Sequence, residues 1–266
     1  MSVLAVIPVH NERESILRVL TQTLVYVPDV LVVDDGSTDG TEKLLENLPD
    51  VKVLPHCKNM GYGRTLIDGF DYAVQNDFDA VVTLDADGQH DPSRIPAFLA
   101  ELADVDIVSG SRYMTELDED SMPPPDRLRI NRLVAQDLEL RLGLELTDAF
   151  CGFKAYRTDA LRRMRLTETG YAMPVELWVQ AAALRLRIKE IPVPRIYVPT
   201  ADRTFGGRLD RPDVRLRYYR DVLERASAVA SLPGPAVGME VPSEGACGSW
   251  PVRHPRSSCS FHRERD

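Results

Sequence analysis

The chain has 266 residues, of which 44% are hydrophobic and 27% charged, and its formal net charge at pH 7 is −9. This composition is typical of a soluble globular protein that can bury one sizeable core, and it excludes a disordered or fibrous chain. The negative charge argues against general nucleic-acid binding, and no apolar run approaches the ~20 residues that span a bilayer.

The first part of the chain alternates short apolar runs with amphipathic segments. The apolar runs predict strands over residues 4–9, 30–33, 51–54, 80–84 and 105–108, and the amphipathic segments predict helices over 12–27, 61–75 and 92–102. This alternation predicts an α/β domain with a mostly parallel sheet and helices on both faces. Residues 1–9 are apolar but lack a basic start, so we expect a strand there and not a signal peptide.

The second part of the chain is less regular. Residues 114–126 are acidic and then proline-rich, which predicts an extended loop over a pocket. Further helices are expected over 128–142, 159–164, 175–186 and 214–230, and further strands over 148–156 and 188–193. Gly152 indicates that another group approaches the backbone closely. Residues 1–230 are therefore expected to form one domain, and residues 231–266 a disordered tail. The scattered cysteines predict reduced thiols and a cytoplasmic protein.

The sequence Asp85-Ala86-Asp87-Gly88-Gln89 follows directly after a predicted strand. An extended backbone points both carboxylates to the same side, and a turn at Gly88 brings Gln89 to the same centre. Such oxygen ligands suit Mg²⁺ or Mn²⁺, with diphosphate oxygens completing the shell. A plain turn with a helix cap is the alternative. We favour the metal site because polar clusters also follow the other strands, and parallel sheets bind ligands outside the carboxyl ends of their strands.

Five motifs occur in order along the chain: Ile7-Pro8-Val9-His10-Asn11-Glu12, Val33-Asp34-Asp35-Gly36-Ser37-Thr38-Asp39-Gly40-Thr41, Leu84-Asp85-Ala86-Asp87-Gly88-Gln89-His90, Gly110-Ser111-Arg112-Tyr113 and Cys151-Gly152-Phe153-Lys154. Together they resemble the family 2 glycosyltransferases, and within these the dolichyl-phosphate mannose synthase (polyprenyl-phosphate glycosyltransferase) group. The resemblance implies a GT-A (Rossmann-like) fold, a nucleotide-sugar donor, a divalent metal and inversion at the anomeric carbon.

The resemblance also implies roles for residues at the donor site. It implies that the nucleoside pocket is lined by Pro8, His10, Glu12, Val33 and Asp35. At the position of His10 the group commonly has Tyr. The metal and diphosphate motif is matched by Asp85, Asp87 and Gln89, and Asp85 and Ala86 would also contact the donor.

Several basic residues match positions that contact phosphates in this group. Arg112 matches a residue near the donor or acceptor phosphate, and Arg127 and Asn131 stand near the place of acceptor-phosphate contacts. A solvated helix face is an equal interpretation of Arg127. Arg203 and Arg208 belong to a segment that resembles the Arg-x-x-Gly-x-Ser-Lys loop, with Gly-Arg in place of Ser-Lys. An Arg keeps the charge and the forked donors at that position. Residues 171–178 predict either core packing or an acceptor wall.

These observations predict a metal-dependent inverting glycosyltransferase. The expected reaction moves a hexose, mannose from GDP-mannose or glucose from UDP-glucose, to a polyprenyl phosphate, with Asp87 acting through the cation on the leaving diphosphate. A lipid phosphate is already an anion at pH 7, whereas a hydroxyl acceptor needs a general base, for which Asp148 is the candidate. A lipid acceptor implies peripheral docking on the cytoplasmic membrane face or a membrane partner.

Other functions remain open at this stage. The same donor chemistry could act on a soluble or protein-bound hydroxyl. A sugar-1-phosphate nucleotidyltransferase is more distant, because the first strand lacks a Gly-rich loop with Arg or Lys that would hold a triphosphate. A catalytically silent nucleotide-sugar sensor is a third class.

Overall fold

The structure, a computed structural model, describes residues 1–114, 123–194, 196, 205 and 207–230. The predicted tail over 231–266 and most of the predicted loop over 114–126 lie outside the described residues. The strands are β1 (Val3–Val9), β2 (Asp29–Asp34), β3 (Val51–Pro55), β4 (Ala80–Thr83), β5 (Ile107–Ser111), β6 (Lys154–Arg157) and β7 (Ile188–Pro192). They form a 7-stranded sheet in the order β3-β2-β1-β4-β6-β5-β7.

The predicted mostly parallel sheet is confirmed. Among the described strands only β6 runs antiparallel to its neighbours, β4 and β5. The helices are α1 (Ile16–Leu24), α2 (Thr41–Leu45), α3 (Tyr62–Gln75), α4 (Ile95–Glu101), α5 (Pro125–Leu142), α6 (Thr158–Arg163), α7 (Met173–Ala183) and α8 (Pro212–Ala230), with short 3₁₀ segments η1 (Pro92–Arg94) and η3 (Gly207–Asp210).

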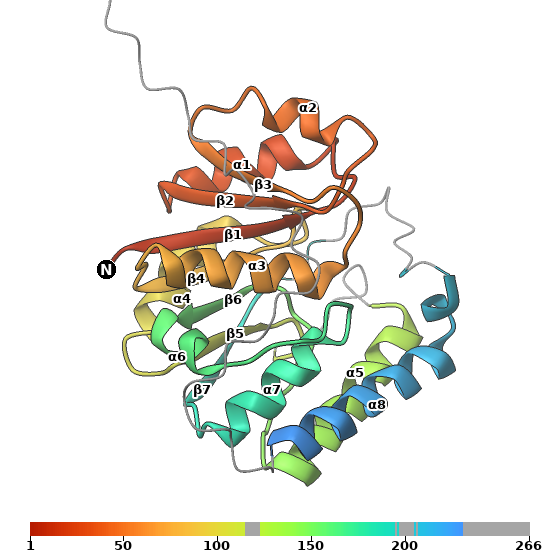
Figure 1. Ribbon diagram of the computed structural model, residues 1–266. Helices are drawn as coiled ribbons and strands as arrows, with labels where there is room; N and C mark the ends of the chain where they lie inside the picture. Colours follow the sequence, from red (N-terminus) through yellow and green to blue (C-terminus); the bar gives the residue numbers. More distant parts are fainter. Residues whose placement is uncertain (115–122, 195, 197–204, 206, 231–266) are drawn as a thin grey trace, which may run out of the picture.

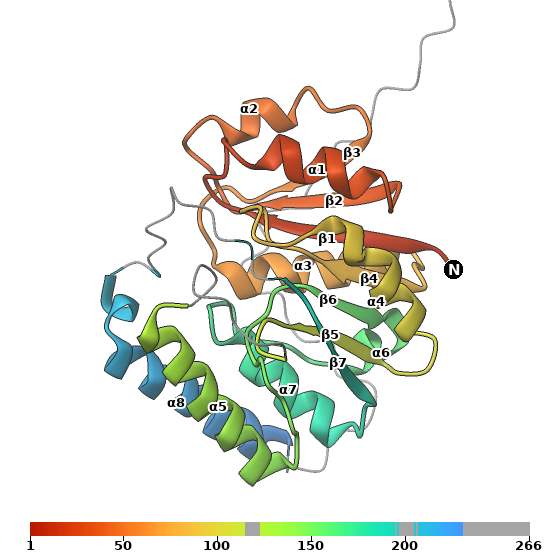
Figure 2. The same cartoon turned by 180° about the vertical axis from the view of Figure 1, so that it is seen from behind.

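The sheet is apolar on both faces because helices cover both of them. Along β1, Leu4 and Val6 join one core cluster and Ala5 and Ile7 join the other. This alternation follows from the two-residue period of a strand. Helices α3, α6 and α7 lie on the face seen in Figure 1, and α1 and α4 lie on the face seen from behind in Figure 2.

Helices α5 and α8 lie side by side beyond α7, at one end of the molecule (Figures 1 and 2). Ion pairs join them along their length: Asp126 to Arg215, Asp137 to Arg220, and Arg141 to Glu224. Residue numbers rise together in these pairs, so the two helices run in the same direction. The starts of both helices therefore lie together.

Helix α1 begins at Ile16, later than predicted. Polar contacts hold the preceding residues in a loop. Asn11 has a φ of 57°, its backbone N–H donates to Ser37 Oγ at 2.9 Å, and its side-chain Oδ1 accepts from the N–H of Thr38 at 2.8 Å. These bonds tie the loop after β1 to the loop after β2.

The predicted strand over residues 148–156 is wrong in its first part. Strand β6 covers only Lys154–Arg157, and residues 148–153 form a turn. Partners from distant parts of the chain hold this turn: Thr83 Oγ1 of β4 donates to the carbonyl of Gly152 at 2.7 Å, and Nε of Arg112, just after β5, donates to Asp148 at 2.7 Å. Because these partners are remote in sequence, local periodicity does not reveal the turn.

Candidate active site

A cavity of about 630 Å³ lies at the carboxyl ends of the parallel strands. From β1 the chain moves outward through β2 and β3, and β4 then returns to the other side of β1. Such a switch point leaves a crevice between neighbouring loops, where open α/β sheets bind ligands. The cavity is lined by eleven of the predicted site residues: Pro8, His10, Glu12, Asp35, Asp85, Ala86, Asp87, Gln89, Arg112, Arg127 and Asn131.

Four predicted residues have other positions. Val33 is fully buried in the core, and Asp148 is fully buried beneath the cavity wall. Arg208 is exposed in η3 and does not line the cavity. Arg203 lies outside the described residues. Val33 lies in β2, and its side chain packs into the hydrophobic core on one face of the sheet. Its position matches a pocket residue of the family, but its side chain does not reach the cavity.

The two carboxylates of the Asp85-Ala86-Asp87 motif line the cavity from the end of β4. Asp85 accepts from the hydroxyl of Tyr62 at 3.2 Å, and its backbone N–H donates to Nδ1 of the buried His90 at 3.1 Å. Asp87 Oδ1 accepts from the N–H of Gln89 at 2.8 Å, across Gly88, whose φ is 74°. A positive φ favours glycine, so Gly88 permits this tight turn.

The chemistry of this donor set fits a hard divalent cation that is shared with a ligand. Within the described part of the chain, no group of three or more His, Cys, Asp or Glu side chains converges on a preformed metal site. Two carboxylates and an amide leave several positions of a six-coordinate cation unfilled. Oxygens of a bound diphosphate are the natural complement.

Gly152 packs directly against Asp85. A Cβ at this glycine would lie 2.4 Å from Asp85 Oδ2. The turn around it is held by Thr83 and by the buried Lys154, whose Nζ donates to the carbonyl of Cys151. The expected close approach to the Gly152 backbone is thus confirmed, and the group that approaches is a candidate metal ligand.

The loop after β2 is organised by the buried carboxylate of Asp35. It accepts from the N–H groups of Met60 and Gly61 at 2.7 and 2.9 Å and bonds to Nδ1 of His56 at 2.7 Å. His56 Nε2 lies 2.9 Å from Asp68. Asp35 therefore shapes the cavity wall by holding residues 56–61 in place.

These contacts shift the pKa values of both partners. Burial raises the pKa of Asp35, but the bonds from His56, Met60 and Gly61 outweigh it, so the pKa is lowered. Burial lowers the pKa of His56, but the two carboxylates raise it to about 9. His56 is therefore a buried imidazolium at neutral pH.

Arg112 is held by Asp148 in a two-pronged ion pair. Its Nε and Nη2 donate to the two carboxylate oxygens at 2.7 and 2.9 Å, and its backbone N–H donates at 3.2 Å. Burial raises the pKa of Asp148, but the Arg112 charge and bonds hold it below its usual range. The predicted role of Asp148 as a general base needs correction, because this buried carboxylate is committed to Arg112 and does not line the cavity.

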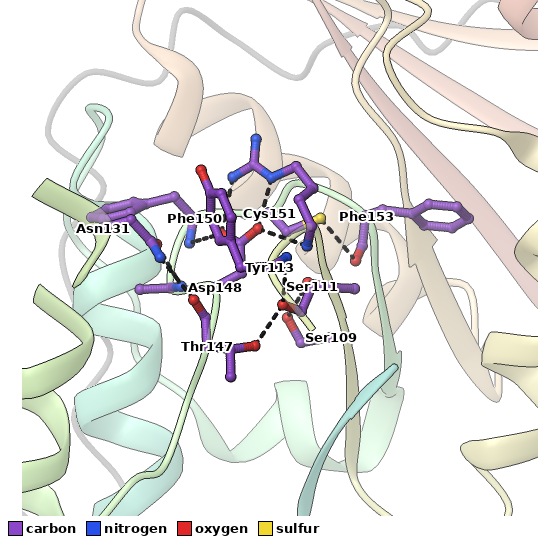
Figure 3. A network of polar contacts seen from close by, with 12 residues as sticks. Ser109, Ser111, Tyr113, Asn131, Thr147, Asp148, Phe150, Cys151 and Phe153 are labelled. Atoms are coloured by element: carbon purple, nitrogen blue, oxygen red, sulfur yellow. Dashed lines mark hydrogen bonds and ion pairs between the residues drawn. The ribbon is translucent and has the colours of Figure 1, made fainter. Parts of the chain in front are cut away.

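A network of side chains fixes the loop that carries Asp148 (Figure 3). Asn131 donates to the carbonyl of Thr147 at 2.8 Å and accepts from the N–H of Ala149 at 3.0 Å. Glu190 of β7 accepts from the N–H groups of Thr147 and Asp148 at 2.7 and 3.0 Å. Both ends of the Asn131 amide thus bind the loop, which favours a supporting role for this residue.

Aromatic side chains from α3, α8 and connecting segments, together with arginines from α5 and α8, form the remaining wall. The rings of Tyr62 and Tyr171 stack with their centroids 5.9 Å apart, and Tyr171 meets Phe205 edge-on at a centroid distance of 5.3 Å. The ring centroids of Phe150 and Tyr219 lie 4.6 Å apart. Arg215, buried in α8, also lines this wall. Sequence reasoning missed Tyr62, Phe205, Arg215 and Tyr219. The acceptor-wall interpretation of residues 171–178 is supported at Tyr171 and Pro174, which line the cavity, while Trp178 belongs to the core.

None of the helices in the described residues combines the length and apolar character that crossing a bilayer requires.

Comparisons with known proteins agree with this architecture. The profile described as Glycosyl transferase family 2 matches residues 4–165. An undecaprenyl-phosphate mannosyltransferase of Micrococcus luteus is 36% identical over 202 residues, which cover 73% of this chain and 83% of that protein. A polyprenol monophosphomannose synthase of Mycolicibacterium smegmatis is 31% identical over 201 residues, covering 71% and 76%.

A solved structure shows the same fold. Glucosyl-3-phosphoglycerate synthase from Mycobacterium tuberculosis, crystallised with Mn²⁺ and UDP-glucose, has a TM-score of 0.64 at 21% identity. The match covers 90% of this chain and 82% of that chain. The predicted GT-A fold is thereby confirmed.

Substitution Gly152→Ala is expected to displace the Asp85 carboxylate, because the added Cβ cannot share its space. We expect the increase in Tm produced by Mn²⁺ with UDP or GDP to be lost, together with about 1–3 kcal/mol of stability from overpacking. Gly143→Ala is the control, since it adds backbone strain at a φ of 69° where a Cβ meets nothing within 4 Å. An undiminished shift in Gly152→Ala would contradict the assignment.

The buried His56 predicts a defined pH dependence of stability. Its pKa is raised on folding, so its contribution is fully present below about 6.5, the unfolded value, and is lost as the pH rises through about 9. Urea unfolding of wild type and His56→Gln should therefore differ most near pH 6 and converge towards pH 10. A difference that grows with pH would exclude a charged His56.

Proposed function

Because the chain belongs to glycosyltransferase family 2, we propose that this glycosyltransferase moves a hexose from a nucleotide sugar to a polyprenyl phosphate with inversion at the anomeric carbon. The two relatives named above are described as acting with undecaprenyl phosphate and polyprenol phosphate, and both as mannosyl enzymes. Mannose is accordingly the hexose we favour, with GDP-mannose as its donor.

The strand-end loops form the donor side of the cavity. His10 Nδ1 lies 2.9 Å from the carbonyl of Asp35, and Asn11 Nδ2 lies 3.2 Å from His10 Nε2. A neutral imidazole satisfies both contacts when Nδ1 donates and Nε2 accepts. The ring is exposed and fixed in orientation, so it can stack on a ribose or a base as the Tyr of related enzymes would.

Asp85, Asp87 and Gln89 would hold Mg²⁺ or Mn²⁺ together with the donor diphosphate. When bound, the cation neutralises the charge that grows on the leaving diphosphate. Arg112 faces the same cavity and adds a fixed positive charge, and its pairing with Asp148 keeps the guanidinium in one orientation.

The choice of a phosphate acceptor is carried by one observation, the composition of the opposite wall. Arg127 and Arg215 line it together with Tyr171, Phe205 and Tyr219. The guanidinium of Arg127 suits a phosphate, and the aromatic rings suit an isoprenoid chain. In this reaction the phosphate oxygen attacks the anomeric carbon as the diphosphate leaves, and it needs no general base because it is already ionised.

Transfer to a soluble or protein-bound hydroxyl is the alternative, and it would require a base near the anomeric carbon. The described carboxylates that line the cavity are Glu12, Asp35, Asp85 and Asp87, all from the donor-side loops. Since Asp148 is bound to Arg112, it does not fill this need. For a lipid acceptor we propose docking at the cytoplasmic face of a membrane, directly or through a membrane partner.

Removal of a metal ligand is expected to weaken donor binding and transfer. Wild type should show an increase in Tm with GDP-mannose or UDP-glucose only when Mg²⁺ or Mn²⁺ is present, and Gln89→Ala should weaken this increase. Asp87→Asn should lower transfer by about 100-fold or more, because it removes a charged ligand of the cation. Equal shifts in the presence of EDTA would count against metal dependence.

An acceptor assay tests the proposed function directly. Wild type is expected to transfer mannose from GDP-mannose to undecaprenyl phosphate, and to leave undecaprenol, which has the same chain but no phosphate, unmodified. Transfer confined to a water-soluble hydroxyl would reject the lipid acceptor. Release of pyrophosphate from a nucleoside triphosphate and a sugar phosphate would support a nucleotidyltransferase instead, and donor binding without any transfer would support a sensor.

A further inference from the structure

Arg215 connects several segments at the acceptor side of the cavity. The residue is only 3% exposed, yet it lines the cavity. Its Nη2 donates to Asp126 of α5 at 2.6 Å, and its Nη1 donates to the carbonyl of Leu209 in η3 at 3.0 Å. Its guanidinium carbon lies 4.3 Å from the ring centroid of Phe205. A buried guanidinium needs such partners, and they hold α5, η3 and Phe205 in one arrangement around α8.

Phe205 extends this arrangement across the cavity. The guanidinium of Arg127 lies 5.2 Å from the same ring, and Tyr171 meets the ring edge-on. Tyr171 stacks on Tyr62, whose hydroxyl donates to Asp85. A continuous series of contacts therefore runs from Arg215 to the carboxylate motif on the donor side.

The same two helices provide a matched comparison. Arg220 of α8 donates through Nε to Asp137 of α5 at 2.7 Å, much as Arg215 pairs with Asp126. Arg220 does not line the cavity. Loss of this second pair should loosen the two helices without changing the position of Phe205.

We propose that Arg215 is a positioning residue for the acceptor: it orients Phe205, and through it Arg127, toward the acceptor phosphate. This inference rests on the proposed function. A lysine at this position keeps the charge, but its ammonium is a single point donor. It cannot bond Asp126 and Leu209 while also placing a planar cation over the Phe205 ring.

The test compares steady-state kinetics with undecaprenyl phosphate as the acceptor and GDP-mannose as the donor. In Arg215→Lys we expect the acceptor KM to rise about tenfold, the scale of one charged hydrogen bond, with donor KM and kcat within about twofold of wild type. Arg220→Lys should lower the Tm and leave the acceptor KM unchanged. Phe205→Leu keeps both arginines and should reproduce the acceptor defect, which provides the test if Arg215→Lys does not fold.

The outcomes separate this inference from the proposed function. If Arg215→Lys and Arg220→Lys raise the acceptor KM equally, or if Phe205→Leu leaves it unchanged, Arg215 supports only helix packing and the inference is overturned. A rise in donor KM that matches the rise in acceptor KM would also overturn it. If wild type transfers no mannose to undecaprenyl phosphate, the proposed function is wrong, and the inference, which rests on it, is wrong as well.

Discussion

The contact between the Asp85 carboxylate and the backbone of Gly152 is the constraint on which the active site depends. It joins the end of β4 to the turn over residues 148–153, which follows more than sixty residues later in the chain. The carbonyl of Gly152 accepts from Thr83, two residues before Asp85. The candidate metal ligand and the turn that supports Arg112 are thus fixed to each other, so the proposed donor and phosphate contacts share one rigid frame.

Three ion pairs, each with at least one buried partner, support the walls of the cavity. Asp148 pairs with Arg112, Asp35 with His56, and Asp126 with Arg215. Removing one partner would leave a buried charge uncompensated, which is strongly destabilising. Such pairs orient loops and guanidinium groups, and Asp85 and Asp87 line the cavity from the end of β4.

The sequence predicted the strand-end residues well, because a parallel sheet gathers the carboxyl ends of its strands at one edge. Pro8, His10, Asp85, Asp87 and Arg112 all line one cavity. Sequence-based prediction was less informative where the role of a side chain depends on partners that are distant in the chain. The sequence offers Asp148 as a candidate general base and Asn131 as a phosphate contact, and the structure adds that Asp148 is bound by Arg112 and that Asn131 bonds the backbone of Thr147 and Ala149.

The missed residues have the same explanation. Tyr62 begins α3 and Arg215 lies in α8. In both helices the sequence pattern is that of an ordinary buried or solvated helix face, so it does not mark these residues as part of a site. Phe205 lies between Arg203 and Arg208, in a segment whose resemblance implies phosphate contacts and not an aromatic wall. Their shared function arises only from stacking between elements that are far apart in sequence.

The sequence by itself determined the α/β class, the sheet's parallel character, the family motifs and the position of the carboxylate motif, because these follow from local periodicity and from residue types at strand ends. Tertiary structure decided which carboxylates line the cavity and which cationic side chains pair with Asp35 and Asp148. It also decided that α5 and α8 run in the same direction and bring Asp126 to Arg215. Such choices depend on contacts between distant segments, and no local pattern encodes the distance between two side chains.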